Sequence, residues 1–333
     1  MMSLDVAVVT APDGHVVDEI DELLGRVTKA TGHDALSEHK RVALRHTVDR
    51  TDASNRDRAL FVGVLARLDS GADRDGPRTQ KDLVGYAELV GKTHSGPFAV
   101  ELVVDPEFAS PAVGSTAVGD ALLGAALEEV ARAGGGTVRL WVARASPADD
   151  ALAAAHGLRI ERNLIQMRCR LPLDTSGTTR PDLPVPTRSF RPGVDEAAWL
   201  ATNNRAFAGH SEQGRWEMAT LLEREKERWF DPSGFLVVGE GGRIAGSCWT
   251  KIHADTDPPM GEIYVIGVDP DFHGRGWGRA LTLAGLDWLA GAGMSVGMLY
   301  VDAANTAAVS LYRSIGFAED HVDRSYSGRF EPA

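Results

Sequence analysis

The segment 273–279, HGRGWGR, sets glycines and arginines between two apolar stretches and is the sharpest chemical motif in the chain. Glycines let a backbone turn tightly and bring successive N–H groups close to a ligand. A helix that begins in such a turn adds unpaired N–H groups and the positive end of its dipole, which favour a phosphate or pyrophosphate. Many G-x-G turns only change the chain direction, and this one lacks the Lys-Ser/Thr end of a P-loop. The segment predicts an anion cradle made of His273, Gly274, Arg275, Gly276, Trp277, Gly278 and Arg279.

Cysteine and histidine give no comparable signal for a metal. Cys169 and Cys248 are the only cysteines, and neither stands at a spacing typical of metal ligands. Small buried thiols in a reducing compartment are the expected role of both. His210 lies near Glu212, but no second pair of ligands follows at a suitable spacing. The sequence therefore predicts no metal and a loop position for this histidine.

The composition is that of an ordinary soluble chain of two domains. Its 333 residues, 43% hydrophobic and 25% charged, suit two globular domains. A net charge of −12 argues against nucleic acid or an anionic membrane as the main partner, but it leaves room for a local basic pocket. The first residues do not resemble a signal peptide, and no run of apolar residues is long enough to span a membrane. We expect a cytoplasmic monomer without nucleic-acid or membrane partners.

The two halves of the chain resemble each other, which predicts a duplicated domain. VELVVDPEF, ending at Phe108, matches IYVIGVDPDF, ending at Phe272, and LWV at 140–142 matches LYV at 299–301. The matches keep their order along both halves with one gap between them. Residues 174–187 mix prolines with Ser, Thr and Gly, as expected of a linker. We therefore predict domains over 1–173 and 188–333, joined by the linker 174–187.

Hydrophobic periodicity predicts a mixed α/β sheet in each half. In the first half we expect strands over 59–68, 83–90, 100–104 and 138–143, with a long helix over 115–132. In the second half we expect strands at 188–191, on both sides of a turn at 241–242, before the glycine turn, at MLYVDA and in the tail. Helices are expected over 195–207 and 216–228, directly after the glycine turn, and after Asn305.

The glycine turn and the segments around it resemble the GNAT superfamily of N-acetyltransferases. VDPDFHGRGWGRALTLAGL and LYVDAANTAAVSLYRSIGF match its two signature motifs, except that His273 stands where the superfamily has Gln or Arg. That departure leaves the backbone cradle in place. The resemblance implies an α/β fold of two tandem GNAT-type domains, each a mixed, mostly antiparallel sheet flanked by helices. It also implies acetyl-CoA as cosubstrate, held by the turn and by Ile266, Gly267, Val268, Asn305, Thr306, Ala307, Ala308, Val309 and Ser310.

A closer resemblance covers nearly the whole second half. NNRAFAGHSEQGRW, GSCWTKIH and LYVDAANTAAV are similar to the mycothiol synthases, a tandem-domain family within that superfamily. The resemblance implies transfer of acetyl from acetyl-CoA to the cysteinyl amine of cysteinyl-glucosaminyl-inositol, which gives mycothiol. Taken alone, each matching residue is typical of a solvated surface. The residues that match the family's substrate contacts are Glu38, Glu212, Lys251, Glu262 and Tyr300.

Amine acetylation needs an unprotonated amine and a proton for the departing thiolate. Glu262 could take the ammonium proton, directly or through a water, and Tyr312 could protonate the thiolate. A surface glutamate at a strand end and a tyrosine packed in the core are the structural alternatives. Backbone N–H groups of residues 266–268 resemble those that hold the acetyl carbonyl in the superfamily, although Gly267 could equally serve packing.

The first half departs from the cofactor motif. A proline removes one N–H group and two positive charges are lost, so pyrophosphate binding is weakened. Leu102, Val103 and Val104 still match the strand that holds a pantetheine arm in the family. We predict a catalytically silent domain that helps to form the substrate site. Its departures are Pro111, Ala112, Ser115 and Ala153 at the positions of Arg275, Gly276, Arg279 and Tyr312.

Two alternatives stay open from the sequence. A superfamily member could acetylate another small amine, such as an aminoglycoside, or a protein N-terminus. An enzyme for protein termini has no reason to hold the group Glu212, Lys251 and Tyr300. A non-catalytic acyl-CoA-binding module would tolerate loss of Glu262 and Tyr312, and this chain has both.

Overall fold

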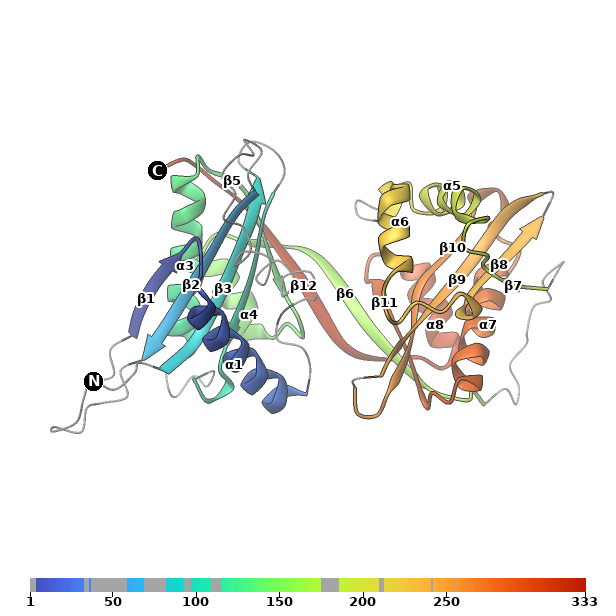
Figure 1. Cartoon of the computed structure of the whole chain (residues 1–333), viewed down its shortest axis with the longest axis horizontal. Helices are drawn as coiled ribbons and strands as arrows, with labels where there is room; N and C mark the ends of the chain where they lie inside the picture. Colours follow the sequence, from blue (N-terminus) through green and yellow to red (C-terminus); the bar gives the residue numbers. More distant parts are fainter. Residues whose placement is uncertain are drawn as a thin grey trace. The chain divides into compact units, whose positions relative to one another are not determined.

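The computed structural model describes residues 4–32, 36, 59–68, 82–92, 97–108, 115–174, 186–209, 213–240, 242–254 and 256–333 (Figure 1). The chain forms two compact units. Unit 1 comprises Met1–Asn163 with Asp323–Ala333, and unit 2 comprises Leu164–Val322. No helix in the described ranges is long and apolar enough to cross a membrane.

Unit 1 is built on a sheet whose strands run in the order β1-β2-β3-β4-β5-β12. All neighbours are antiparallel except β4 and β5, which are parallel. The strands are β1 (Leu4–Val9), β2 (Ala59–Leu68), β3 (Asp82–Lys92), β4 (Phe98–Val104), β5 (Gly136–Val142) and the last part of β12 (Ala318–Phe330). The helices are α1 (Gly14–Thr31), α3 (Ser115–Arg132) and α4 (Pro147–Ala155), with a short 3₁₀ turn, η1 (Pro106–Phe108).

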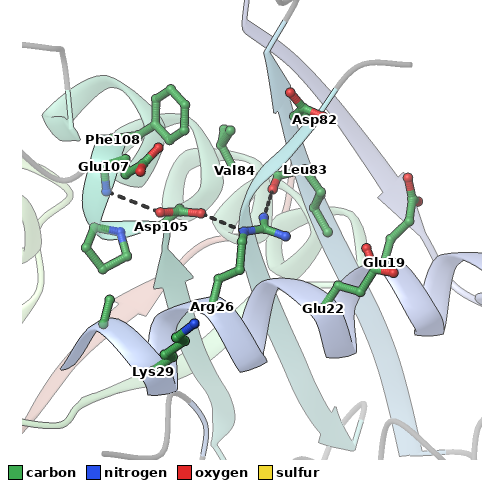
Figure 2. Close-up of a pocket in the computed structure, with 12 residues that line it drawn as sticks. Glu19, Glu22, Arg26, Lys29, Asp82, Leu83, Val84, Asp105, Glu107 and Phe108 are labelled. Atoms are coloured by element: carbon green, nitrogen blue, oxygen red, sulfur yellow. Dashed lines mark hydrogen bonds and ion pairs between the residues drawn. The ribbon is translucent and has the colours of Figure 1, made fainter. Parts of the chain in front are cut away.

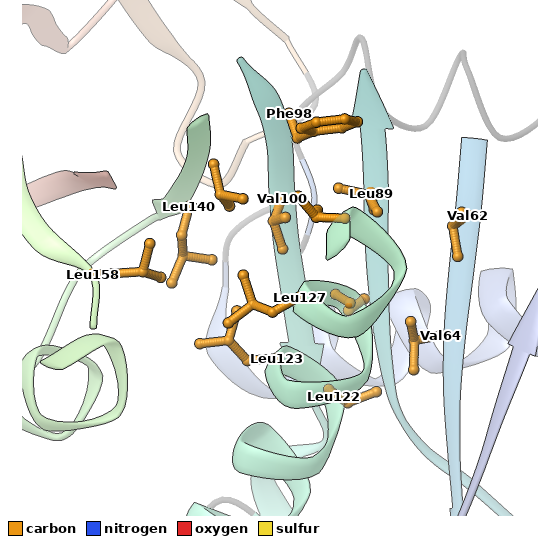
Figure 3. Close-up of a cluster of buried hydrophobic side chains, with 14 of the residues drawn as sticks. Val62, Val64, Leu89, Phe98, Val100, Leu122, Leu123, Leu127, Leu140 and Leu158 are labelled. Atoms are coloured by element: carbon orange, nitrogen blue, oxygen red, sulfur yellow. The ribbon is translucent and has the colours of Figure 1, made fainter. Parts of the chain in front are cut away.

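Helices cover both faces of the unit 1 sheet. Figure 3 shows α3 directing Leu122, Leu123 and Leu127 toward side chains of β2, β3 and β4. The helix α1 packs on the other face with its own buried apolar stripe, which includes Ile20 and Leu23. These two layers of apolar side chains bury the middle of the sheet and leave its strand ends for other contacts.

Unit 2 repeats this plan with strand order β6-β11-β10-β9-β8-β7. Only β10 and β11 are parallel. The strands are β6 (Arg159–Arg170), β7 (Arg188–Ser189), β8 (Phe235–Glu240), β9 (Arg243–His253), β10 (Met260–Val268) and β11 (Val296–Asp302). The helices are α5 (Glu196–Ala206), α6 (Met218–Glu225), α7 (Trp277–Gly291) and α8 (Thr306–Ile315), with 3₁₀ turns η2 (Gln213–Arg215), η3 (Pro232–Gly234) and η4 (Pro270–Phe272).

The two faces of the unit 2 sheet carry different cores. On one face α7 and α8 bury an aliphatic cluster that includes Cys248, Ile263 and Leu281. Gly285 lets α7 approach closely, since a Cβ there would lie 2.4 Å from the sulfur of Cys248. On the other face α5 and α6 cover an aromatic cluster around Trp199 and Trp249. Alternate residues of each strand therefore face opposite layers.

Two strands pass from one half of the sequence into the sheet of the other. Residues 164–170 of β6 pair with β11 in unit 2, and residues 324–330 of β12 pair with β5 in unit 1. The predicted domain bounds, 1–173 and 188–333, would assign all of β6 to the first domain and all of β12 to the second. The unit boundaries instead fall inside the two strands, near residues 163 and 322. Residues 175–185 lie outside the described ranges, so the linker stays a prediction.

Most elements agree with those expected from periodicity. The strand over 59–68 and the helix over 115–132 have the predicted bounds, and β8 and β9 form the expected hairpin. The hydrophobic periodicity did not predict β1 and α1. A start signal for α1 was present in Asp13, whose side chain accepts a hydrogen bond from the backbone N–H of Val16 at 2.9 Å.

Candidate active site

The parallel strands β10 and β11 stop pairing with each other in the middle of the unit 2 sheet. Their ladder runs from the pair Met260–Val296 to the pair Ile263–Leu299 and ends there, while β10 continues to Val268. A β-bulge between Ile263 and Val265 lies at the same point. Bulges terminate pairing and are common beside active sites. In the described part of unit 2, residues 265–268 therefore have a ladder partner only on the β9 side, and their other edge is open to a further strand or an extended ligand.

The predicted backbone contacts lie on this separated part of β10. Ile266, Gly267 and Val268 are paired with β9 and have no partner in β11. Gly267 also serves packing, because a Cβ there would lie 3.3 Å from the Cβ of Ala206 and 3.2 Å from the ring of Phe207. A larger side chain at this position would therefore press on the end of α5 whether or not a ligand is bound.

The glycine turn has the conformation of an anion cradle. Gly274 and Gly276 adopt φ values of 75° and 77°, which favour glycine. The helix α7 begins at Trp277, and its N-cap residue, Gly276, provides no side-chain acceptor. The N–H groups of the first helical turn therefore keep their capacity to bind an anion. Trp277 anchors the turn by stacking on Phe272, with ring centroids 4.9 Å apart.

Charged side chains surround the turn. Arg275 lies 3.5 Å from Glu240 and has its guanidinium 5.3 Å from the ring centre of Phe272. Arg279 donates a hydrogen bond to the hydroxyl of Ser314 at 2.7 Å. His273 places its Nε2 2.9 Å from the carbonyl oxygen of Val268, so this departure from the family motif ties the turn to β10.

Asp269 fixes the start of the turn. Its carboxylate accepts hydrogen bonds from Arg205 at 3.0 Å, from Arg243 at 3.1 Å and from the backbone N–H of Asp271 at 3.0 Å. Burial alone would raise the pKa of Asp269, but these hydrogen bonds and the two positive charges outweigh it and lower the pKa. The charged carboxylate joins α5, β9 and the turn.

Three predicted substrate and catalytic residues share one face of the unit 2 sheet. Lys251 stands opposite Glu262 in the β9–β10 ladder, and Met298 stands opposite Glu262 in the β10–β11 ladder. Residues paired directly across strands point to the same face, and so do residues two apart along a strand. Tyr300 therefore lies on the face of Lys251 and Glu262, which we call the polar face.

Glu262 is held by a residue that the sequence motifs did not single out. Its side chain is buried, with the residue 7% exposed, and its Oε2 lies 2.7 Å from Nε2 of His253. His253 follows Lys251 by two residues on β9 and so belongs to the polar face. The signal was present in the sequence as the alternation of Lys251 and His253 in a predicted strand.

Two aromatic rings on the polar face contact the ammonium group of Lys251. Its Nζ lies 4.8 Å from the ring centre of Trp229 and 5.8 Å from that of Tyr264, the bulged residue of β10. Cation–π contacts of this kind place a lysine ammonium over an apolar surface. The bulge thus brings an extra aromatic ring onto the face that carries Glu262.

Tyr300 is oriented by β6. Its hydroxyl accepts a hydrogen bond at 2.7 Å from Gln166, which stands opposite it in the β6–β11 ladder. Arg168 donates to the amide oxygen of Gln166 at 2.8 Å and lies 3.2 Å from Asp320. These contacts come from NLIQMRCRLPL, which precedes the predicted linker, so a segment of the first half helps to build the polar face of unit 2.

Tyr312 lies on the opposite face, in the core under α7 and α8. It is 7% exposed, and its ring packs edge-on against Phe317. Burial raises the pKa of Tyr312, and the neighbouring Cys248 adds to the rise. The phenol therefore keeps its proton at neutral pH and can act as a donor. Cys248 itself is buried, and burial raises the pKa of its thiol to about 12.

Of the remaining predicted residues, some lie at the start of α8 and the others lie outside the described residues. Asn305 is the N-cap of α8, where its side chain accepts a hydrogen bond from the N–H of Ala308 at 3.1 Å. Val309 is buried in the core, whereas Thr306, Ala307 and Ser310 are exposed near the start of the helix. Glu38, His210 and Glu212 lie outside the described residues, so their predicted roles stay predictions.

Unit 1 has a separated strand pair of its own. The β4–β5 ladder ends at the pair Glu101–Trp141, and Leu102, Val103 and Val104 continue beyond it. At the end of β4, Arg26 of α1 donates to Asp105 at 3.0 Å and to the carbonyl of Leu83 at 2.8 Å, as Figure 2 shows. The hollow beside this pair has a volume of about 690 Å³, and its lining holds more acidic than basic side chains, an excess that disfavours a pyrophosphate. The acidic side chains are Glu19, Glu22, Asp82, Asp105 and Glu107.

Comparison with known proteins places the chain in a family. A model of the acetyltransferase (GNAT) family matches residues 198–317. A mycothiol acetyltransferase of Acidimicrobium ferrooxidans is 39% identical over 315 residues, which cover 94% of each chain. A mycothiol acetyltransferase of Geodermatophilus obscurus is 42% identical and covers 91% of each. The chain belongs to the mycothiol acetyltransferase family. This membership confirms the resemblance seen in the sequence motifs.

Solved structures confirm the tandem fold. A tandem GNAT protein from the clavulanic acid biosynthesis pathway aligns over 99% of this chain and all of its own, with a TM-score of 0.65 at 16% identity. A GCN5-related N-acetyltransferase from Sphaerobacter thermophilus aligns over 98% of this chain and 96% of its own, with a TM-score of 0.64 at 21% identity. At these identities the likeness extends to the fold alone.

Proposed function

We propose that this protein transfers the acetyl group of acetyl-CoA to the cysteinyl amine of cysteinyl-glucosaminyl-inositol, giving mycothiol. Membership of the mycothiol acetyltransferase family supports acetyl transfer in mycothiol biosynthesis. The observation that carries the mechanism is the position of Glu262 and Tyr312. Glu262 lies on the polar face of β10, one residue before the β10–β11 ladder ends, and Tyr312 lies in the core on the opposite face of the sheet.

The residues around the glycine turn fit acetyl-CoA. Acetyl-CoA supplies an activated acetyl thioester. The uncapped start of α7, with Gly274 and Gly276, would hold its pyrophosphate, and Arg275 and Arg279 would add charge. The free edge of β10 would pair with the pantetheine arm as a neighbouring strand does, with N–H groups that polarise the acetyl carbonyl.

Glu262 and Tyr312 then act on different protons. The carboxylate of Glu262 removes a proton from the substrate ammonium on the polar face, which frees the nitrogen lone pair. As the new N–C bond forms, the C–S bond breaks and its electron pair stays on sulfur. The phenol of Tyr312, protonated at neutral pH, donates its proton to that thiolate from the other face. The acylated nitrogen loses its second proton to water, and exchange with solvent returns a proton to Tyr312 and removes the one held by Glu262. Transfer is direct and no bond to the enzyme is formed.

The polar face suits an amino-sugar with a polyol. A cationic amine and several hydroxyl groups need both acceptors and donors, which Glu262, Lys251 and Tyr300 provide. Trp229 and Tyr264 add flat apolar surface beside them. The predicted contacts of Glu212 and Glu38 belong to the same proposal.

The test is an assay of the full chain with acetyl-CoA and cysteinyl-glucosaminyl-inositol, followed by mass spectrometry. We expect a product that gains one acetyl group, keeps its free thiol and loses its primary amine. Glucosaminyl-inositol without cysteine should react much more slowly. Equal rates with a panel of unrelated amines would refute the proposed substrate.

A further inference from the structure

His253 lies at the end of β9 and makes a close contact with Glu262. The Nε2 atom of His253 and the Oε2 atom of Glu262 are 2.7 Å apart, and the two side chains are 22% and 10% exposed. In the β9–β10 ladder His253 stands opposite Met260, and Glu262 stands opposite Lys251. The contact is therefore a diagonal pair on the polar face, within reach of a long side chain.

The two carboxylate oxygens of Glu262 have different surroundings. Oε2 is bound to His253, whereas Oε1 has no hydrogen-bond partner among the described residues. Lys251 is the other charged residue directly across from Glu262, and its ammonium lies over the rings of Trp229 and Tyr264. One oxygen of the carboxylate is thus fixed and the other is open.

The chemistry of the pair defines which atom carries the proton. An ionised carboxylate only accepts hydrogen bonds, so the ring nitrogen that faces it must be the one that bears hydrogen. His253 therefore donates through Nε2–H, and a donor to a charged acceptor gives a short and strong hydrogen bond. Such a bond fixes the rotation of a carboxylate that is otherwise free to turn about its last torsion angle.

We propose that His253 is a positioning residue for Glu262. Its Nε2–H holds Oε2 and thereby directs Oε1 toward the substrate amine. This inference rests on the proposed function, because it takes Glu262 as the group that removes the ammonium proton. In that step the substrate N–H bond breaks and an O–H bond forms at Oε1, while the Nε2–H bond of His253 stays intact.

Two substitutions separate hydrogen-bond donation from mere packing. His253→Leu removes the donor, and His253→Gln keeps an amide N–H near the position of Nε2. We expect His253→Leu to lower kcat by about 10- to 100-fold, a part of the 10²- to 10⁴-fold that a positioned base contributes. His253→Gln should recover most of this rate. The KM for acetyl-CoA should stay at the parent value in both, because the glycine turn is untouched.

Unit 1 offers a matched control. His156, the residue that follows α4, has its Nε2 2.9 Å from the Oδ1 of Asp120 on α3, so the two form a second histidine–carboxylate pair. His156→Leu should leave kcat unchanged. The proposal is overturned by a parent-like kcat in His253→Leu, by a His253→Gln variant as slow as His253→Leu, by an equal loss in His156→Leu, or by a KM for acetyl-CoA that rises together with the loss of rate.

A measurement without substrate tests the pair independently of the proposed function. NMR spectra of the protein labelled with ¹⁵N-histidine, assigned by comparison with His253→Gln, report which nitrogen of His253 is protonated. The Nε2–H form at neutral pH supports the proposal, and the Nδ1–H form overturns it. If the parent protein acetylates no cysteinyl amine, the proposed function fails while this result still decides the His253–Glu262 pair.

Discussion

The separated strands β4 and β5 of unit 1 and β10 and β11 of unit 2 form the same structure with different side chains. In both units one parallel pair interrupts an antiparallel sheet, and its ladder ends before the strands do. Only β10 contains a bulge beside this end, whereas the β3–β4 register is regular. The bulge inserts Tyr264 into the polar face and ends the ladder at Ile263.

The chemical groups differ more than the backbone does. When the pairs Val100–Leu140 and Ile263–Leu299 are superposed, Ala99 takes the place of Glu262. Ala153 stands at the sequence position of Tyr312 and is fully buried, and its methyl group has no proton to donate to a thiolate. The fold therefore supplies a strand edge for a ligand, and the side chains decide whether chemistry follows.

The largest effect should come from cutting the chain at the predicted linker. A truncated chain that begins at residue 187 lacks residues 164–170 of β6, which pair with β11 and bury Ile165, Met167 and Cys169 in the unit 2 core. It also keeps residues 324–330 of β12 without β5. We expect this chain to lack the cooperative thermal unfolding transition of the full protein, as measured by circular dichroism. A folded and active truncated chain would show that unit 2 needs no strand from the first half.

The pairing of β6 with unit 2 and of β12 with unit 1 could not be predicted from the sequence. The helix at 115–132 and the β8–β9 hairpin followed from periodicity and turn residues, because both are local signals. Lys251, Glu262 and Tyr300 were placed together by resemblance. The alternation in β6 shows that one face is buried, but it does not show which sheet edge the strand joins. The contact of Gln166 with Tyr300 depends on that register and could not be predicted. The contact of His253 with Glu262 depends on the register between β9 and β10, which the alternation within β9 does not fix.

The next largest effect concerns the two groups that unit 1 lacks. Removal of a positioned acid or base costs about 10²- to 10⁴-fold in rate. Glu262→Gln should lose kcat mainly at lower pH, where the amine is protonated, and recover partly as the pH rises. Tyr312→Phe should lose rate without this recovery, because the thiolate still lacks its acid. The measurement is the pH dependence of kcat for each variant, and profiles that match the parent would remove both residues from the mechanism.

A smaller effect is expected at the glycine turn. Gly276→Val places a branched side chain at a φ of 77°, beside the N–H groups that would bind the pyrophosphate. Loss of one charge-assisted hydrogen bond of about 1.5–3 kcal/mol should raise the KM for acetyl-CoA by about 10- to 200-fold. Gly293→Val is the matched control, since Gly293 has a φ of 86° and no neighbour within 4 Å. An equal change in KM in both variants would attribute the effect to backbone strain and not to the cradle.

The smallest expected effect is on the free energy of unfolding, when the aspartates that follow β4 and β10 are substituted. Asp105 is bound by the single arginine Arg26, whereas Asp269 is bound by Arg205 and Arg243. Each arginine is about half exposed, so solvent weakens the pairs, and we expect Asp269→Asn to cost about 1–2 kcal/mol at neutral pH. Asp105→Asn should cost less, because one charge is lost opposite one arginine. Urea unfolding of the full chain and the two variants measures both values.

The free energy of unfolding at acidic pH provides a second measurement of the contribution of Asp269. The pKa of Asp269 is lower in the folded protein than in the unfolded chain, so the unfolded chain binds the proton more readily. The stabilisation from Asp269 is complete above the unfolded value of about 4 and is lost as the pH falls toward the lowered folded value. Asp269→Asn cannot titrate at this position, so its free energy of unfolding should approach that of the parent as the pH drops below about 4. A constant difference between the two proteins from pH 7 to pH 3 would show that the arginine pairs do not stabilise the charged form. The loss in Asp269→Asn would then come from packing or from the cap of η4, and the difference between the two units would lie in their catalytic groups alone.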